Sequence, residues 1–267
     1  MAERGVAVAD IEFSVEAGVG TILLNRPAHK NAFTMEMIDA WAQMLQQART
    51  DRTVGVIVVR GAGDAFCAGI DLDHLEALHL MPLDWKALLT ERIHQIALTL
   101  ENFGKPVIAA VNGPAVGAGL DMALMCDMRF AARSARFAES YVRLGLVPGD
   151  GGCFYLPRLV GVARALELLL TGDVIEAIEA ERIGMVNRVY DDDQLLTEVY
   201  KFATRLAAGP PLVLKMIKQA VYESMRTDLR TSLDLISSHM VVVQSSYDGQ
   251  EAMAAFREKR TPVFEGR

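Results

Sequence analysis

The sequence has few cysteines, no long apolar run and no basic cluster, and each absence excludes a class of protein. Cys67, Cys126 and Cys153 are widely spaced and form no Cys-x-x-Cys pair. We therefore expect buried free thiols, with neither a disulfide framework nor a zinc site. The five histidines form no ligand-spaced pair, so no metal is expected. No apolar run reaches the roughly 18 residues that span a bilayer, which excludes a membrane-spanning protein.

The charge balance is acidic, with a formal net charge of −7. The longest basic run is the pair inside Glu258–Arg260, so nucleic acid is not expected as a partner. Residues 1–13 mix charges into their sequence and lack the apolar core of a signal peptide. We therefore expect a cytoplasmic protein, and an organelle stays open if a transit peptide has been removed. The length of 267 residues allows one large domain or two small ones.

Apolar periodicity predicts alternating strands and helices in the first part of the chain. Strands are expected at residues 11–15, 20–25, 54–59, 107–111, 128–131 and 136–138, and helices at residues 35–49 and 84–102. From residue 163 onward helical patterns dominate, with breaks at Gly172, Gly184 and Gly209. This order predicts an α/β core followed by a mostly helical C-terminal part.

The segment Lys105–Asp127 carries the most informative pattern, an apolar strand, a glycine-rich turn and a helix. Gly113, Gly117 and Gly119 punctuate the turn, and Asp121 lies near the start of the helix. Such a turn leaves backbone N–H groups free at a helix N-terminus, where a negative oxygen is favoured. An ionisable carboxylate beside these donors indicates proton chemistry next to an oxyanion.

A second segment, Arg60–Asp73, repeats this pattern after the apolar strand at residues 54–59. Its sequence is RGAGDAFCAGIDLD. The two strand-turn-helix units can supply one backbone N–H each to a single thioester oxygen. One such donor contributes roughly 2.7–4 kcal/mol of transition-state stabilisation.

These two turns and their spacing resemble the enoyl-CoA hydratase/isomerase (crotonase) superfamily. Thr21–Ile38 is similar to the family's first strand and helix, Phe137–Gly152 to the segment that closes its active site, and Tyr247–Arg267 to its closing helix and tail. The resemblance thus covers nearly the whole chain. It implies an α/β fold, a crotonase-like spiral of ββα units with a helical C-terminal trimerisation region. Residues 1–209 would form the core with the acyl-CoA site, and residues 210–267 a trimerisation and lid region of the same unit.

The resemblance assigns the oxyanion-hole N–H groups to Ile70 and Ala118. Ala118 replaces the more usual glycine, which is tolerable if its φ is negative. Asp121 stands at the first acid/base position, where hydratases usually carry glutamate and some dienoyl-CoA isomerases carry aspartate. A helix N-terminus lowers the pKa of this carboxyl and an apolar acyl pocket raises it, so the direction stays open.

Tyr141 is the main departure from the family pattern, because hydratases carry their second catalytic glutamate at this position. Syn addition of water needs one group to activate the water and another to handle the proton on the α-carbon. A phenol, with its reference pKa near 10, is a poor general base at neutral pH. Tyr141 can instead donate a hydrogen bond, position a water or only line the pocket.

Asp150, in the loop Pro-Gly-Asp-Gly-Gly, is the candidate replacement for the missing carboxylate. Isomerases and dehalogenases of the family carry an acidic residue one position earlier, at the equivalent of Gly149. A glycine-flanked loop can absorb a shift of one residue. The alternative is an N-cap role for Asp150 in the following helix. Glu139 shares the face of Tyr141 only if this segment is extended.

Five further residues are candidates for contact with the substrate or its CoA. They are Ala68, Asp71, Gly117, Lys259 and Phe264. Asp71 is also expected to hold its turn. The alternatives for the last two, which resemble tail residues that touch CoA across a subunit boundary, are a solvated charge and a packing aromatic.

Taken together, the residues predict an enzyme that acts on an unsaturated acyl-CoA thioester through an enolate. With aspartates and no second glutamate, double-bond isomerisation is easier to write than hydration, which would require Asp121 and Asp150 to share a water. A hydrolase or lyase of the same fold, or a catalytically weak scaffold that binds CoA esters, also stays open. No permanently bound cofactor is expected, because CoA arrives with the substrate. By resemblance, the chain forms trimers or hexamers.

Overall fold

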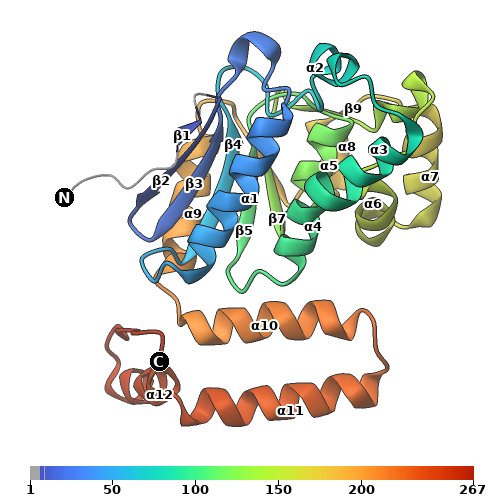
Figure 1. Cartoon of the computed structure of the whole chain (residues 1–267). Helices are drawn as coiled ribbons and strands as arrows, with labels where there is room; N and C mark the ends of the chain where they lie inside the picture. Colours follow the sequence, from blue (N-terminus) through green and yellow to red (C-terminus); the bar gives the residue numbers. More distant parts are fainter. Residues whose placement is uncertain (1–6, 9) are drawn as a thin grey trace.

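The computed structural model describes residues 7–8 and 10–267, so most of the charged N-terminal segment lies outside the described part. The chain forms a seven-stranded mixed sheet, a smaller three-stranded sheet and a set of helices that cover both (Figure 1). The large sheet has the order β1 (Ala7–Val8), β2 (Ile11–Glu16), β3 (Val19–Leu24), β4 (Val56–Gly61), β5 (Val107–Val111), β7 (Met128–Ala132) and β10 (Arg188–Tyr190). The small sheet has the order β6 (Ala115–Val116), β8 (Arg136–Ala138) and β9 (Ile175–Glu176).

The helices follow the strands in the alternation that the sequence predicts. Those of the core are η1 (Pro27–His29), α1 (Met35–Thr50), α2 (Leu72–Ala77), α3 (Pro82–Leu88), η2 (Leu89–Ile93), α4 (His94–Glu101), α5 (Ala118–Leu124), η3 (Ser140–Leu144), α6 (Gly152–Val160), α7 (Val162–Thr171), α8 (Ala177–Arg182) and α9 (Leu195–Ala207). The C-terminal helices are α10 (Pro211–Ser224), α11 (Leu229–Ser245) and α12 (Tyr247–Glu258). The expected α/β core with a mostly helical C-terminal part is therefore confirmed. Among the described residues, no helix has the length and apolar character needed to cross a bilayer.

The central strands are parallel and buried on both faces. Val56 and Val58 of β4 pack toward α9, whereas Ile57 and Val59 pack into the larger core that contains α1 (Figure 1). This alternation follows from the two-residue period of a strand. Strands covered on both sides read as continuous apolar runs, which is why β4 and β5 were recognisable in the sequence.

Helix α1 forms where the apolar stripe predicts it. The side chain of Thr34 accepts a hydrogen bond from the N–H of Met37 and caps the helix start. Trp41, Met44 and Leu45 are at most 1% exposed and fill the space against the sheet. Complete burial of a side chain of this size stabilises the fold by roughly 1.5–3 kcal/mol.

The helix predicted at residues 84–102 is confirmed as a continuous helical segment made of α3, η2 and α4, but the π-helical turn η2 inside it was not predicted. The helical segment begins earlier, at Pro82, whose missing N–H costs nothing in a first turn. In η2 the hydroxyl of Thr90 donates to the carbonyl of Lys86 at 2.9 Å and so competes with the regular backbone pattern. The π turn precedes His94, whose Nε2 lies 2.7 Å from the carbonyl oxygen of Gly149. The hydrogen bond between His94 and Gly149 ties α4 to the loop that carries Asp150.

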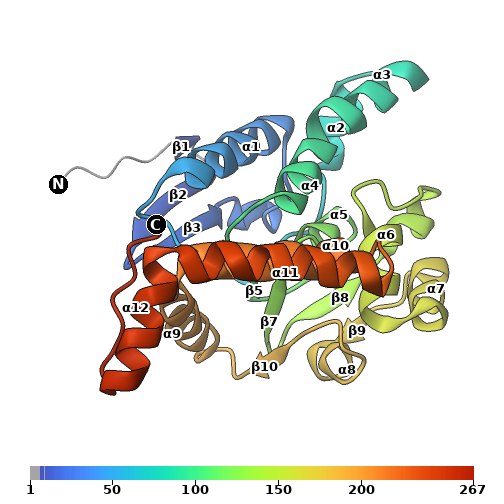
Figure 2. The same ribbon diagram turned by 90° about the horizontal axis from the view of Figure 1, so that it is seen from below.

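The helical pair α10 and α11 lies beneath the core, across the edge where the parallel strands begin (Figures 1 and 2). Asp127 anchors α10, since its carboxylate accepts hydrogen bonds from Lys218 Nζ at 2.7 Å and from the Tyr222 hydroxyl at 2.8 Å. Pro210 is the N-cap residue of α10. The division of the chain into residues 1–209 and 210–267 stays a prediction.

Candidate active site

The two glycine-rich turns lie side by side at the carboxyl ends of β4 and β5. Cys67 and Ala115 form a parallel β-bridge, and the N–H of Val116 donates to the Cys67 carbonyl at 3.0 Å. A Cβ added at Gly69 would lie 3.0 Å from the Val116 oxygen and 3.5 Å from the Ala118 nitrogen. The chain therefore brings Ile70, which follows Gly69, next to the turn that holds Ala118.

Both turns depend on glycine at one position. Gly69 has a φ of +99° and Gly117 a φ of +52°, which other residues rarely adopt. Ala118, by contrast, has no positive φ, so alanine is tolerated there as expected. Within the described part of the chain, the N–H groups of Ile70 and Ala118 donate no hydrogen bond to another protein group. Two free donors thus lie in adjacent turns.

The three predicted catalytic side chains meet beside these turns. Asp121, on α5, is 0% exposed, and its Oδ2 accepts a hydrogen bond from the Tyr141 hydroxyl at 2.8 Å. The same hydroxyl lies 2.9 Å from Oδ2 of Asp150, which is 5% exposed. Tyr141 belongs to η3, and Asp150 to the loop before α6. The phenol therefore links the two carboxyl groups and does more than line a pocket.

Asp150 does not cap the following helix, so the N-cap alternative is wrong. Gly151 is the N-cap residue of α6, and no side chain caps that helix. Gly151 has a φ of +122°, a conformation that reverses the chain directly after Asp150. The glycine-flanked loop thus places Asp150 against Tyr141, despite its shift of one residue from the family position.

The Tyr141 phenol has one hydroxyl hydrogen for the two carboxyl oxygens that it contacts. Tyr141 donates that hydrogen to one carboxylate. Its short contact with the other carboxyl oxygen is favourable only if that carboxyl is protonated and donates to the phenol oxygen. This arrangement suits a proton shared by Asp121 and Asp150 across Tyr141.

Burial favours the neutral form of every group in this cluster. It raises the pKa of Asp121 to about 7, with a further contribution from the charge of Asp150, while the hydrogen bond from Tyr141 opposes the shift. Burial likewise raises the pKa of the Asp150 carboxyl and that of the Tyr141 phenol. The sequence left the direction of the pKa shift of Asp121 open, and burial decides it: the pKa is raised.

Glu139 is a third buried carboxylic acid beside Asp121 and Asp150, expected from the sequence to join them only in an extended segment. Its side chain is 1% exposed. Glu139 is the N-cap residue of η3, with φ −86° and ψ 70°, so the segment from Glu139 to Tyr141 is not extended. A Cβ added at Gly152 would lie 2.5 Å from Asp121 Oδ1 and 2.9 Å from Glu139 Oε1. Glu139 therefore approaches Asp121 at the oxygen that Tyr141 does not contact. The available signal was an ionisable residue directly after a short strand whose last two residues are buried.

The candidate residues in the glycine-rich turn of Arg60–Asp73 form hydrogen bonds within the protein. Asp71 accepts hydrogen bonds from the N–H of His74 at 3.0 Å and from Arg26 Nη1 at 2.9 Å, so it caps α2 and holds the turn. Ala68 is exposed and its N–H donates to the carbonyl of Lys30 at 2.9 Å. Ligand contacts of Ala68, Asp71 and Gly117 stay predictions.

The two tail candidates do not reach the carboxylates within one chain. Lys259 ends α12 with a φ of +55°, and Phe264 follows it. Helix α12 and the C-terminus lie away from α2, α3 and α6 in both views (Figures 1 and 2). One further correction concerns the thiols: Cys67 and Cys126 are buried, but Cys153, at the start of α6, is exposed.

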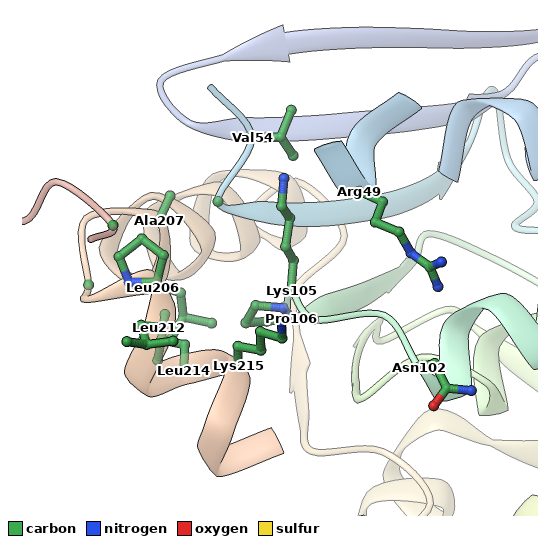
Figure 3. Close-up of a pocket in the computed structure, with 15 residues that line it drawn as sticks. Arg49, Val54, Asn102, Lys105, Pro106, Leu206, Ala207, Leu212, Leu214 and Lys215 are labelled. Atoms are coloured by element: carbon green, nitrogen blue, oxygen red, sulfur yellow. The ribbon is translucent and has the colours of Figure 1, made fainter. Parts of the chain in front are cut away.

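A groove of about 530 Å³ lies at the other edge of the sheet. Lys105 and Pro106 line it from the segment before β5, and Leu206, Leu212 and Lys215 line it from α9 and α10 (Figure 3). Open parallel sheets bind ligands at the carboxyl ends of their strands. The groove lies at the amino ends, so it marks the seam between the core and the C-terminal helices. The carboxylate cluster is the candidate active site.

The fold and the buried acid cluster define an α/β enzyme, and comparison with known proteins identifies its family. Residues 14–267 match the sequence model of the family described as Enoyl-CoA hydratase/isomerase. The chain therefore belongs to the enoyl-CoA hydratase/isomerase family and has the crotonase fold, as the sequence motifs predicted. It is an enzyme of the hydratase or isomerase type.

Named relatives cover both reactions. The 1,2-epoxyphenylacetyl-CoA isomerase of Escherichia coli K12 is 39% identical in an alignment that covers 95% of this chain and 97% of the length of that enzyme. The crotonyl-CoA hydratase of Syntrophomonas wolfei is 36% identical over 97% of this chain and 99% of its own. Among solved structures, an enoyl-CoA hydratase from Bacillus anthracis has a TM-score of 0.92 at 33% identity, covering 97% of this chain and 100% of its own.

Proposed function

We propose that this enzyme moves a double bond in an unsaturated acyl-CoA thioester. The observation that carries this proposal is the Tyr141 hydroxyl between Asp121 and Asp150, at 2.8 Å and 2.9 Å. Isomerisation removes a proton from one carbon and returns a proton to another. Two acids that share a proton through one phenol can perform both transfers.

The reaction starts from the arrangement of the shared proton in which Asp121 is ionised and Asp150 is protonated; the opposite arrangement, with the proton on Asp121, converts to it through the Tyr141 hydroxyl. Asp121 takes a proton from the substrate carbon next to the thioester or from the carbon beyond the double bond, and a dienolate forms. Asp150 then gives its proton to the other carbon. A shift of hydrogens along Asp121, Tyr141 and Asp150 restores the starting state, so no net proton is gained or lost. The acids are buried, and burial brings the pKa of Asp121 to about 7, where a general base works best.

The dienolate oxygen is stabilised by the N–H groups of Ile70 and Ala118. Their turns are adjacent, and neither N–H is used inside the described part of the protein. Donors fixed before the reaction lower the barrier because they need no reorganisation when charge develops on the oxygen. CoA enters as part of the substrate, and we propose no permanently bound cofactor and a cytoplasmic location.

Apolar side chains next to the site suit an acyl group. The segment between Tyr141 and Asp150 exposes Val142, Leu144, Leu146 and Val147, by 41% to 77%. The segment after Ile70 exposes Leu72, Leu78, Met81 and Leu83, by 37% to 80%. Large exposed apolar patches on a protein surface mark binding sites. We propose that the acyl chain of the substrate covers these apolar side chains.

Hydration is the second candidate, favoured by relatives whose names are crotonyl-CoA hydratase and 2,3-dehydroadipyl-CoA hydratase. It requires Asp121 and Asp150 to hold a water, because Tyr141 replaces the second glutamate. The name 1,2-epoxyphenylacetyl-CoA isomerase of another relative supports the first candidate.

The proposal is tested by incubating the enzyme separately with crotonyl-CoA, a 3-enoyl-CoA and a 3,5-dienoyl-CoA and analysing the products by chromatography and mass spectrometry. We expect a shifted double bond without a change of mass. A gain of one water would establish hydration. Cleavage of the thioester or loss of carbon dioxide would indicate a hydrolase or lyase, and saturable binding without turnover would indicate a scaffold.

We also propose that the chain assembles into trimers, or hexamers made of two trimers, through its C-terminal helices. On α11 the side chains of Leu229, Leu233, Ile236 and Met240 form a stripe at helical spacing and are 38% to 74% exposed. Burying such a stripe requires a partner surface, and a closed homo-oligomer is the usual solution. In an assembly, Lys259 and Phe264 can contact CoA held by a neighbouring subunit.

A charge in this stripe is expected to disrupt the assembly. Leu233→Glu should lower the molar mass measured by light scattering, since a buried carboxylate without a partner costs several kcal/mol. Ser238→Glu, on the opposite side of α11, is the matched control and should keep the native mass. Retention of the full assembly in Leu233→Glu would exclude this stripe as the interface.

A further inference from the structure

Glu139 is a buried acid whose carboxyl group has no conventional partner. Neither of its oxygens accepts a hydrogen bond within the described structure, and the same holds for Oδ1 of Asp121. The two carboxyl groups face each other across Gly152, where an added Cβ would approach Asp121 Oδ1 to 2.5 Å and Glu139 Oε1 to 2.9 Å. Two ionised carboxylates in this position would repel each other, and neither could donate a hydrogen bond to the other.

The surroundings of Glu139 favour a neutral acid. Leu120, Phe137 and Leu156 line the same small space. Burial raises the pKa of Glu139 to about 10, and the charge of Asp121 contributes in the same direction. Buried acids in apolar surroundings keep their proton unless a cation compensates the charge.

Among the residues that the structure describes, no compensating cation faces this acid from the elements packed around it. The charged or titratable groups nearby are Asp121 on α5, Tyr141 on η3, Asp150 in the following loop, Cys153 on α6 and Asp173 before β9. Asp173 is paired with Arg143 at 3.7 Å, so that guanidinium already has an acidic partner. His94 acts on Asp150, from the far side of the cluster.

We propose that Glu139 is a positioning residue that stays protonated and donates its carboxyl hydrogen to Oδ1 of Asp121. This hydrogen bond gives a partner to an otherwise unpaired buried oxygen and holds the carboxylate plane while Tyr141 donates to Oδ2. The cluster of three acids then carries two protons and one negative charge. The consequence for catalysis rests on the proposed function of Asp121 as the base.

The donor role predicts different effects for two substitutions of similar size. Glu139→Gln keeps a neutral donor, so the acidic limb of the pH profile of kcat/KM should stay where it is in the wild type. Glu139→Leu removes the donor that stabilises ionised Asp121. Its acidic limb should move to higher pH by about one unit, with up to about a tenfold loss of kcat/KM below that limb.

An infrared measurement tests the protonation of Glu139 without any turnover. The difference between the spectra of the folded wild type and Glu139→Gln should show the band of a protonated carboxyl group well above neutral pH, in addition to the band of the proton shared by Asp121 and Asp150, which both proteins keep. Absence of the band from the difference spectrum would overturn the proposal even if no substrate is ever found, whereas its presence in an inactive protein would count only against the proposed function. A shift of the Glu139→Gln limb to lower pH would also overturn the proposal, because it would mean that Glu139 is ionised. An unmoved limb in folded Glu139→Leu would exclude the contact.

Discussion

Replacing Asp121 with asparagine is expected to lower kcat by about 10²–10⁴-fold while the affinity for the CoA thioester is retained. Asparagine has the size of aspartate and can still accept the hydrogen bond from Tyr141, but it cannot take a proton from carbon. The measurement is steady-state turnover together with calorimetric binding of a non-reactive CoA thioester. Asp193→Asn is the matched control, since Asp193 is an exposed carboxylate between β10 and α9, outside the proposed acyl-binding segments, and should not matter.

The same variant is expected to be more stable than the wild type above neutral pH. The pKa of Asp121 is raised from 3.8 to about 7, so the folded state holds a proton that the unfolded chain has lost. The free energy of unfolding therefore falls as pH rises between these two values. Asp121→Asn removes this dependence, and its melting temperature should exceed that of the wild type above pH 7 but approach it near pH 4.

Unchanged turnover in a folded Asp121→Asn protein would remove Asp121 from the mechanism.

Replacing Ala118 with proline is expected to lower kcat by about 10²–10³-fold, because it removes one oxyanion donor of the proposed pair. Ala118 is the first residue of α5, a position where proline fits the helix and where the N–H has no helical partner. The loss should therefore appear in turnover more than in the melting temperature. Stopped-flow or steady-state kinetics of the isomerisation provide the measurement.

Ala118→Gly is the control for this substitution, since it keeps the N–H and restores the residue more usual in the family. Turnover close to that of the wild type is expected for it. If Ala118→Pro were folded and fully active, the thioester oxygen would have to bind elsewhere.

Much of the fold could be predicted because its signals are local. The apolar stripe of α1 and the buried run of β5 depend on residues close to each other in the sequence. The two glycine-rich turns were recognisable for the same reason, because their positive φ angles require glycine. Their contact followed from the resemblance to a family rather than from the pattern alone.

The contacts of the acid cluster could not be predicted, because they join residues from separate elements. Tyr141 is 20 residues from Asp121 and 9 residues from Asp150, and a helical turn and a glycine-induced reversal decide where its hydroxyl lies. Glu139 was undervalued because its role depends on the small size of Gly152. The π turn in η2 was missed because the apolar periodicity on both sides of it is helical.

The central claim is that the enzyme moves a proton between two carbons of an acyl-CoA through Asp121, Tyr141 and Asp150. The most direct measurement is turnover of a 3-enoyl-CoA in D₂O, with the product analysed by mass spectrometry and NMR. We expect a product with a shifted double bond, no added water, and deuterium at the carbon that receives the proton. A product heavier by one D₂O, or an isomer that contains no deuterium, would contradict the shared-proton mechanism.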